Sequence, residues 1–467
     1  MRLTWAQPED LVAHEFVALA EQGADPEQVA AVAKRWEVAG GSLQPERAGA
    51  GARPAGPELR FLARQILDEL TALVPGSRDE PDDREAIVAL MTVPSASATG
   101  NRARVAEEDR VAGAWWGRSA GCLLGKPVEK IPREGIEEIA RATGNWPITG
   151  YFTARGLPAE VSARWPWNRR SAPTSLVENI DGMPEDDDLN FPLLVLDLLE
   201  ERGAALTTAD VAQAWLANLP AGRVFTAERA AYRNLLEARD PSGDGASETA
   251  THHNPFREWI GALIRADVYG WAHPGDPVAA ARLAWVDARL SHTRNGLYGA
   301  MWAAALCSTA LVAVSVDEVL DAGESVLPPA SRLLAAVRRG RDLGRSLRTG
   351  ELSDVDALDA LHAEFGHLHW VHTVNNAAVI ACAIGAAGGH GGFGRGVALA
   401  VAAGWDTDSA GATVGSVLGA LTGLSGLDGP WVAPLHGRLA TSLPGTPERS
   451  LAELTVRTRA LRTRMGT

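Results

Sequence analysis

Apolar residues recur every three or four positions along most of the chain, which is the spacing of helices that bury one face. Residues 1–37 show this pattern in two segments, and residues 59–73 show it in a third. From about residue 110 such segments follow one another closely. They predict helices at 189–201, 208–219, 226–238, 256–268, 277–290, 297–314, 328–347, 355–367, 371–387, 395–403 and 410–422. Strand-like alternation is scarce, so the pattern predicts an all-α protein.

Two stretches of different composition divide the chain. Residues 40–56 are rich in Gly, Ala and Pro, and residues 75–108 are charged and rich in Pro and Ser. Such sequences are typical of linkers rather than of packed helices. We therefore expect an N-terminal helical extension with linkers over residues 1–105, and a main domain that carries the chemistry over residues 106–467.

Two of the predicted helices carry glycine at every fourth position. Pro127 ends the first of them, and the glycines stand at positions 113, 117, 121 and 125 in the first helix and 411, 415, 419 and 423 in the second. A helix face without side chains lets a neighbouring backbone approach closely. We expect both helices to lie in a tightly packed core.

Acidic residues gather at the start of two predicted helices. Asp406, Asp408 and Ser409 open the second glycine-spaced helix, and the run Glu-Asp-Asp-Asp at 185–188 precedes the helix at 189–201. One interpretation is that single acids cap the helices and favour their dipoles. The other is that the two helix starts meet and supply five or six oxygen ligands, which suits a pair of Mg²⁺ or Mn²⁺ ions.

The charge balance narrows the classes of partner. The 467 residues include 44 Lys and Arg against 58 Asp and Glu, a formal net charge of −14. This balance argues against non-specific binding to nucleic acid or to anionic membranes. Residues 299–316 and 371–393 approach transmembrane length, but their Ala and Gly content predicts buried helices instead.

The cysteines and the N-terminus indicate a cellular compartment. Cys122, Cys307 and Cys382 lie far apart in the sequence, in no disulfide or zinc pattern, which fits a reducing compartment. The first residues lack the apolar core of a signal peptide. We expect a cytoplasmic protein.

Three blocks of sequence, in this order, resemble the ADP-ribosylglycohydrolases, the family that includes dinitrogenase reductase-activating glycohydrolase. The blocks are Gly117–Glu129, Glu185–Asp188 and Gly404–Ser409, and the resemblance covers roughly residues 110–435. It implies a compact, orthogonal multi-helix domain that binds two divalent ions, Mg²⁺ or alternatively Mn²⁺, over a scissile glycosidic bond. By position, the implied metal ligands are Glu185, Asp186, Asp187, Asp406, Asp408 and Ser409.

The resemblance also implies residues that contact the substrate or attack it. Glu129 matches a glutamate that approaches the metals and the ribose, and either Glu129 or Asp187 would act on the attacking water. Gly125, His292 and His372 are the further substrate-binding candidates. Trp165 and Trp167 lie in a long loop and are candidates for stacking on an adenine, with ordinary packing as the alternative.

The chain departs from the pattern of its relatives at several positions. Relatives usually have Thr at the positions of Glu185 and Asp188, Asp at that of Cys122, and a Gly-Asn pair near Trp259-Ile260. Because of these differences, the resemblance does not determine which substrate the protein binds. The leading hypothesis is hydrolysis of the ribosyl C1″ bond of an ADP-ribosylated protein or small molecule. The alternatives are a glycosidase for another ribosylated metabolite or nucleoside, and a non-catalytic protein that binds ADP-ribose.

Overall fold

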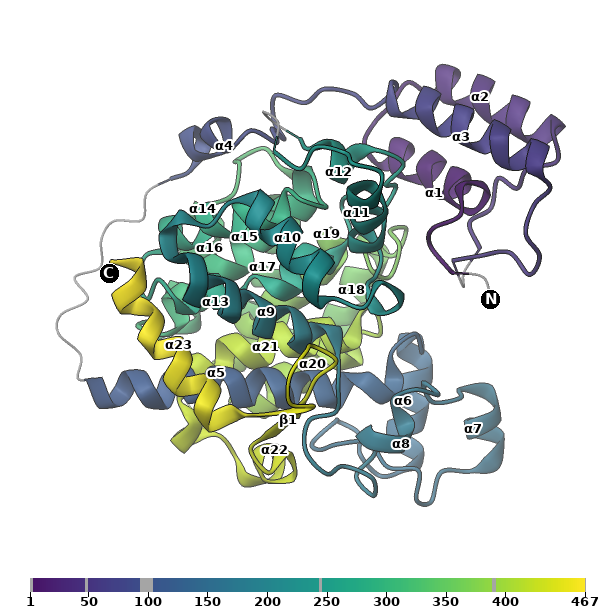
Figure 1. Cartoon of the computed structure of the whole chain (residues 1–467). Coiled ribbons are helices and arrows are strands. Elements are labelled where there is room, and N and C mark those ends of the chain that lie inside the picture. Colours follow the sequence, from purple (N-terminus) through teal and green to yellow (C-terminus); the bar gives the residue numbers. More distant parts are fainter. Residues whose placement is uncertain (1–2, 47–48, 93–103, 243–245, 389–391, 467) are drawn as a thin grey trace.

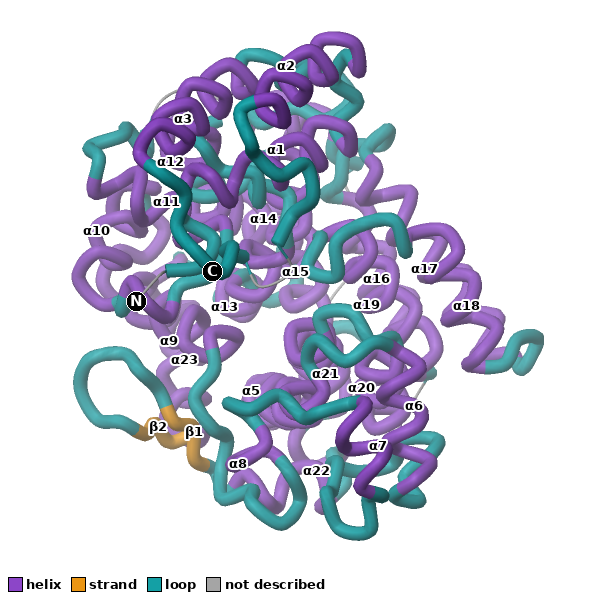
Figure 2. The backbone as a smooth tube through the Cα atoms, turned by 90° about the vertical axis from the view of Figure 1, so that its right-hand side faces the viewer, coloured by secondary structure: helices purple, strands orange, loops and turns teal. Residues whose placement is uncertain are grey.

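The computed structural model describes residues 3–46, 49–92, 104–242, 246–388 and 392–466. Within these residues the chain is helical almost throughout. One small hairpin, in which β1 (Arg438–Ala440) pairs antiparallel with β2 (Glu448–Ser450), forms the only sheet of the described residues (Figure 2). The predicted all-α class is confirmed.

The helices fall into an N-terminal group and a large body (Figure 1). The N-terminal group consists of α1 (Pro8–Glu21), α2 (Pro26–Val38) and α3 (Pro57–Thr71), whereas α4 (Arg84–Leu90) lies apart from them on the body, where Ile87 joins the main core. The α-helices of the body are α5 (Arg104–Gly125), α6 (Arg133–Ala142), α7 (Ala159–Arg164), α8 (Ala172–Ser175), α9 (Asp187–Arg202), α10 (Thr208–Asn218), α11 (Ala227–Leu236), α12 (Glu248–Thr251), α13 (Asp267–Trp271), α14 (Pro277–Ala288), α15 (Arg294–Ala310), α16 (Val316–Ser325), α17 (Arg332–Thr349), α18 (Asp354–Phe365), α19 (Thr373–Ala387), α20 (Gly392–Ala402), α21 (Thr407–Thr422), α22 (Gly429–Val432) and α23 (Leu451–Met465). Short 3₁₀ turns join them, among them η1 (Lys126–Val128) and η4 (Ile260–Arg265).

The predicted helix over residues 256–268 is wrong. The backbone there bonds to other segments: Ile260 N–H donates to the carbonyl of Val371 (2.9 Å), and Thr373 N–H donates to that of Glu258 (3.1 Å). These long-range bonds leave only the 3₁₀ turn η4 and the five-residue α13. Seven helices after α5 are present where the pattern predicted none: α6, α7, α8, α12, α16, α22 and α23.

The glycine-spaced helices α5 and α21 lie directly against each other and run antiparallel. A Cβ atom added at Gly113, Gly117 or Gly121 would collide with a backbone carbonyl oxygen of α21, and one added at Gly415 would collide with the Gly117 carbonyl. The colliding partners are Gly419, Gly415 and Gly411 in that order, so the register runs in opposite directions along the two helices. Gly125, at the end of α5, therefore lies against Thr407, at the start of α21.

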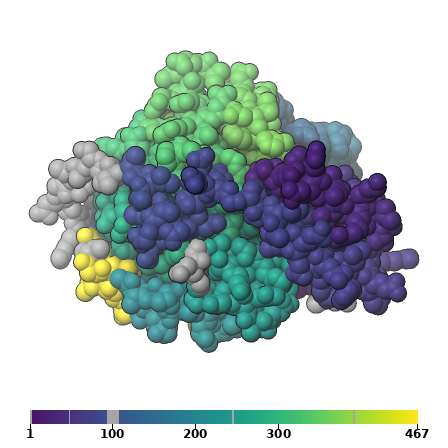
Figure 3. Space-filling view, turned by 90° about the horizontal axis from the view of Figure 1, so that it is seen from above, coloured from purple at the N-terminus to yellow at the C-terminus, as the bar shows by residue number. Residues whose placement is uncertain are grey.

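Helices α1 to α3 lie on the body as an outer layer (Figure 3). Their apolar side chains form a cluster of their own, which Phe256 and Trp259 of the body join. Trp259 stacks on His369 at 4.1 Å and meets Trp5 edge to face at 5.8 Å. The boundary expected at residues 105 and 106 adjoins residues 93–103, which lie outside the described residues, and the division into extension and catalytic domain stays a proposal.

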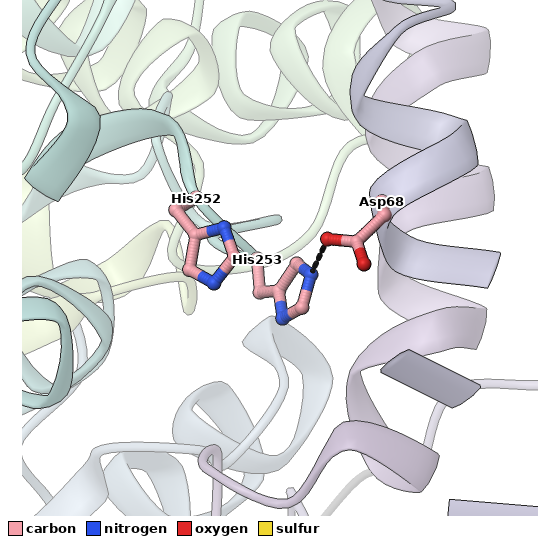
Figure 4. A group of neighbouring side chains, drawn as sticks. All are labelled: Asp68, His252 and His253. Atoms are coloured by element: carbon pink, nitrogen blue, oxygen red, sulfur yellow. Dashed lines mark hydrogen bonds and ion pairs between the residues drawn. The ribbon is translucent and has the colours of Figure 1, made fainter. Parts of the chain in front are cut away.

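A polar contact also joins the layer to the body. Asp68 on α3 faces His253, whose Nε2 lies 2.7 Å from the Asp68 carboxylate (Figure 4). His252 stacks on His253 with ring centroids 3.8 Å apart, and Arg239 lies 3.2 Å from His252 Nε2. The nitrogens of two stacked rings point in parallel and not toward one metal position, and Arg239 already contacts one of these nitrogens. We therefore infer that Asp68, His252 and His253 hold the N-terminal layer against the body and do not bind a metal.

The long uncharged segments are buried helices. They form α15 and α19, whose residues are almost all buried. None of the described helices combines the length and apolar character that a membrane span needs.

The backbone contact between α5 and α21 predicts a large effect of one added methyl group. Gly415→Ala should lower the free energy of unfolding by about 1–3 kcal/mol, because the carbonyl of Gly117 has to move away. Urea unfolding followed by circular dichroism measures the change. Gly429→Ala is the control, since nothing lies within 4 Å of a Cβ there, and it should change stability by less than about 0.5 kcal/mol. Equal stability of both variants would contradict the contact.

Candidate active site

The body brings three acidic segments together. They are Glu129 just after η1, Asp186–Asp188 at the start of α9, and Asp406–Asp408 at the start of α21. The packing of α5 on α21 places the first segment beside the third, and the hydroxyl of Thr407 donates to the carbonyl of Gly125 (3.0 Å). The site is therefore built from residues that lie as far as 282 positions apart in the sequence.

A buried arginine fixes the start of α9. Arg118 on α5 is fully buried and donates to the carbonyl of Asp188 through Nε (2.9 Å) and Nη2 (2.8 Å). Its other terminal nitrogen donates to Asp267 (2.7 Å), and Nη2 also lies 3.4 Å from the Asp188 carboxylate. Asp186 caps the helix by accepting the backbone N–H of Asp188 (2.9 Å).

The start of α21 is held from two sides. The backbone N–H of Asp406 donates to the side chain of Asn376 on α19 (3.2 Å), and the Ser409 hydroxyl donates to the Asp188 carboxylate (3.2 Å). The second bond joins the two acidic helix starts. The Asp406 side chain accepts no capping bond from its helix. The capping interpretation therefore holds for Asp186 and fails for Asp406.

Most of these carboxyl groups repel one another in a buried setting. Burial, and then the carboxylates of Asp186, Asp408 and Glu129, raise the pKa of Asp187 well above its usual range. Burial and neighbouring acids also raise the pKa of Asp188 and Asp406, and they raise that of Asp408 to about 7. Each added negative charge is therefore unfavourable unless a cation compensates it.

The donor set fits a hard divalent cation. The cluster presents carboxylate and hydroxyl oxygens and lies inside the protein, with Asp186, Asp188, Asp406, Asp408 and Ser409 all buried. Asp187 is half-buried. Among the described residues, no Lys or Arg forms an ion pair with Asp187, Asp406 or Asp408, so bound cations would relieve the repulsion directly.

Glu185 lies at the edge of this cluster. Its two carboxylate oxygens are engaged by Asn190 (2.9 Å) and by Arg223 (2.7 Å), and its side chain is 31% exposed. The structure therefore does not bring Glu185 together with the other predicted ligands.

Glu129 connects the acidic cluster to a cavity. Its carboxylate accepts from Asn168 (2.6 Å) and pairs with Lys130 (3.0 Å). The cavity next to it has a volume of about 430 Å³, and its lining residues are Glu129, Lys130, Ile131, Pro132, Arg164, Trp165, Pro166, Asn168 and Arg169. A small molecule in this cavity would touch Glu129.

The two predicted histidines lie in other surroundings. His292 is fully buried, with Nδ1 bonded to Ser291 (2.8 Å) and Nε2 lying 3.9 Å from Glu228. His372 caps α19 and faces Glu21 of α1 at 3.6 Å. The acidic cluster contacts this helix one turn later, through Asn376. The roles of both histidines in substrate binding stay predictions.

Comparison with known proteins identifies the family. The profile of the ADP-ribosylglycohydrolases matches residues 103–461, most of the chain. The protein belongs to the ADP-ribosylglycohydrolase family. Membership supports a glycohydrolase of ADP-ribose-linked substrates.

Two further comparisons add little to the family assignment. A solved structure described as "ADP-ribosylglycohydrolase-related protein complex" is 21% identical, and the alignment covers 77% of this chain and 99% of that one, with a TM-score of 0.43. At that TM-score the likeness carries no argument. No curated protein matches the sequence.

Two cations of this ADP-ribosylglycohydrolase have a role in the site that no motif of the sequence predicted. Arg118 and Lys126 are the charged residues of the otherwise apolar and glycine-rich segment 111–128. That isolation was a usable signal, because a charge in a close-packed helix is buried and needs a partner. Asn168 gave no comparable signal.

The repulsion in the cluster predicts opposite effects of Asp408→Asn with and without metal. When the pKa of a carboxyl group is higher in the folded protein than in the unfolded chain, the protein becomes less stable as pH rises between the two pKa values. For Asp408 this range extends from the ordinary pKa of an aspartate to about 7. At pH 8 in EDTA, Asp408→Asn should therefore raise the free energy of unfolding by about 1–3 kcal/mol, and at pH 4 this gain should vanish.

Added Mg²⁺ or Mn²⁺ should raise the thermal midpoint of the wild type and leave that of Asp408→Asn nearly unchanged. Differential scanning fluorimetry measures both effects. Asp428→Asn, at the exposed start of α22, is the matched control and should behave as the wild type. A metal-induced shift of equal size in all three proteins would place the ion elsewhere.

Proposed function

We propose that this ADP-ribosylglycohydrolase is a metal-dependent enzyme that hydrolyses the ribosyl C1″ bond of an ADP-ribosylated protein side chain or small molecule. The observation that carries the proposal is the cluster of Glu129, Asp186–Asp188 and Asp406–Asp408. Carboxyl groups whose pKa values are raised by burial and then by repulsion from neighbouring acids are characteristic of catalytic or metal sites.

The residues that would hold the ions are Asp186, Asp187, Asp406, Asp408 and Ser409. We propose Mg²⁺ as the preferred ion, with Mn²⁺ as the alternative, in agreement with the hard oxygen donors. Ions bound there would orient the ribose hydroxyls electrostatically and favour an oxocarbenium-like transition state. A cytoplasmic location stays a prediction.

The protein's own residues provide the proton transfer. Glu129 lies between the cluster and the cavity, and Asn168 and Lys130 hold its carboxylate in place. It is positioned to accept a proton from water that attacks C1″. Asp187 is the second candidate base. Its pKa is raised, and a carboxylate with a raised pKa accepts a proton more readily at neutral pH than an ordinary aspartate does.

The cavity beside Glu129 supports an anionic substrate. Lys130, Arg164 and Arg169 line it, and the ring of Trp165 forms part of its wall. Arginine and lysine bind phosphate oxygens, and an exposed aromatic face can stack on a base. Trp165 is fixed by the bond from its indole N–H to Glu138 (2.6 Å). These features suit the diphosphate and adenine of an ADP-ribosyl group.

One observation favours the alternative of a different ribosylated substrate. The segment at Trp259, where relatives have smaller residues, is filled by aromatic rings and covered by Trp5 and His14 of the N-terminal layer. A substrate group bound there in relatives would have no room. A smaller ribosylated compound needs less space and would still reach the acidic cluster.

Turnover against a substrate panel tests the proposal. The full chain with Mg²⁺ or Mn²⁺ should release ADP-ribose from ADP-ribosyl-arginine, ADP-ribosyl-serine or an ADP-ribosylated small molecule, detected by chromatography. Glu129→Gln and Asp187→Asn should each lower kcat by about 100-fold or more with unchanged circular dichroism. Glu137→Gln, an acid on α6 paired with Arg141, is the control and should keep full activity.

The panel also separates the alternatives. Cleavage of simple ribosyl compounds without cleavage of any ADP-ribosylated one would replace the proposal by the second function. Binding of ADP-ribose with no turnover of any compound would identify a non-catalytic binding protein.

A further inference from the structure

Lys126 places a positive charge inside the acidic cluster. The residue follows α5 directly, in η1, and its side chain is only 7% exposed. Its ammonium contacts the Asp186 carboxylate and donates to the carbonyl of Glu185 (3.2 Å). Burial disfavours a charged lysine, and only the neighbouring acids can compensate for it. The carboxylates that would attract metal ions therefore also hold the Lys126 ammonium at this position.

Metal-binding donor types converge beside Lys126. Cys122, four residues earlier on α5, offers a sulfur that lies with carboxylate oxygens of Asp186 and Asp188 within 4.8 Å of one another. Burial and the two acids raise the pKa of the Cys122 thiol well above its usual range, so the thiol stays neutral. Arg118 contacts Asp188 from the other side. This half of the cluster already holds two cations of its own.

Ion pairs divide the cluster into two halves. The carboxylate of Asp186 pairs with Lys126, and that of Asp188 pairs with Arg118. In the part of the chain that the structure describes, no lysine or arginine forms an ion pair with Asp187, Asp406 or Asp408. The negative charge that a bound cation would compensate therefore lies on these three carboxylates.

We propose that Lys126 takes the place of one of the two expected divalent ions, so that the chain binds a single divalent ion in the half formed by Asp187, Asp406 and Asp408. This inference rests on the proposed function, since it concerns the same site. An ion entering between Asp186 and Asp188 would have to displace the ammonium of Lys126 and lie close to Arg118. Coulomb repulsion opposes both at this depth.

The number of bound ions tests the inference. The full-length wild-type protein, equilibrated with Mn²⁺ and dialysed, should retain one Mn²⁺ per chain by inductively coupled plasma mass spectrometry. Lys126→Met keeps the length of the side chain without its charge and should retain two. The two ions should also show spin coupling by electron paramagnetic resonance. Lys34→Met, at an exposed position of α2, is the control and should retain one.

Each other outcome overturns the inference. Two ions in the wild type would show that Lys126 does not exclude the second, and turnover in the substrate panel would leave the proposed function intact. One ion in a folded Lys126→Met protein would overturn it as well. No bound ion in the wild type would overturn both the inference and the metal-dependent reaction. If Lys126→Met does not fold, the wild-type stoichiometry decides.

Discussion

The backbones of α5 and α21 touch at four successive glycines of α5, Gly113 to Gly125, and the positions of the acidic residues of the site depend on that contact. Because glycine occupies each point of closest approach on α5, the two backbones lie in direct antiparallel contact. That contact brings the end of α5 to the start of α21, and with it Glu129 and Lys126 to Asp406 and Asp408. A shift by one turn would separate the two halves of the site.

The same contact explains why charges are tolerated so deep in the protein. The glycine face of α5 packs on α21, which leaves Arg118 on another face to reach Asp188 and Asp267. Arg118 and Lys126 balance part of the acidic charge, and the remaining carboxyl groups stay mutually repulsive. Mutual repulsion of this kind lowers the stability of the folded protein and favours the binding of a cation.

Much of the fold was predictable from local pattern. The 3.6-residue periodicity predicted most of the body helices, and the four-residue glycine spacing predicted the close-packed pair. The acidic runs before α9 and α21 were visible as candidate ligands because four successive acids suit no simple cap. Residues 256–268 were mispredicted, since their backbone bonds to segments far along the chain override a helical pattern.

The long-range part of the site was not predictable in the same way. Nothing in the run 185–188 distinguishes Glu185, which turns to Arg223 and Asn190, from the aspartates that face the core. The layer formed by α1 to α3 is amphipathic by sequence, but the surface that it covers, including Trp259 and His372, follows only from the folded chain. Family resemblance supplied the order of the motifs and left these contacts open.

Anomalous diffraction from crystals soaked in Mn²⁺ would show whether the buried acidic cluster is the cation site of this ADP-ribosylglycohydrolase. We expect an anomalous peak directly ligated by carboxylate oxygens of Asp187, Asp406 and Asp408. A protein that crystallises with all its Mn²⁺ at surface sites, and none among these carboxylates, would contradict it.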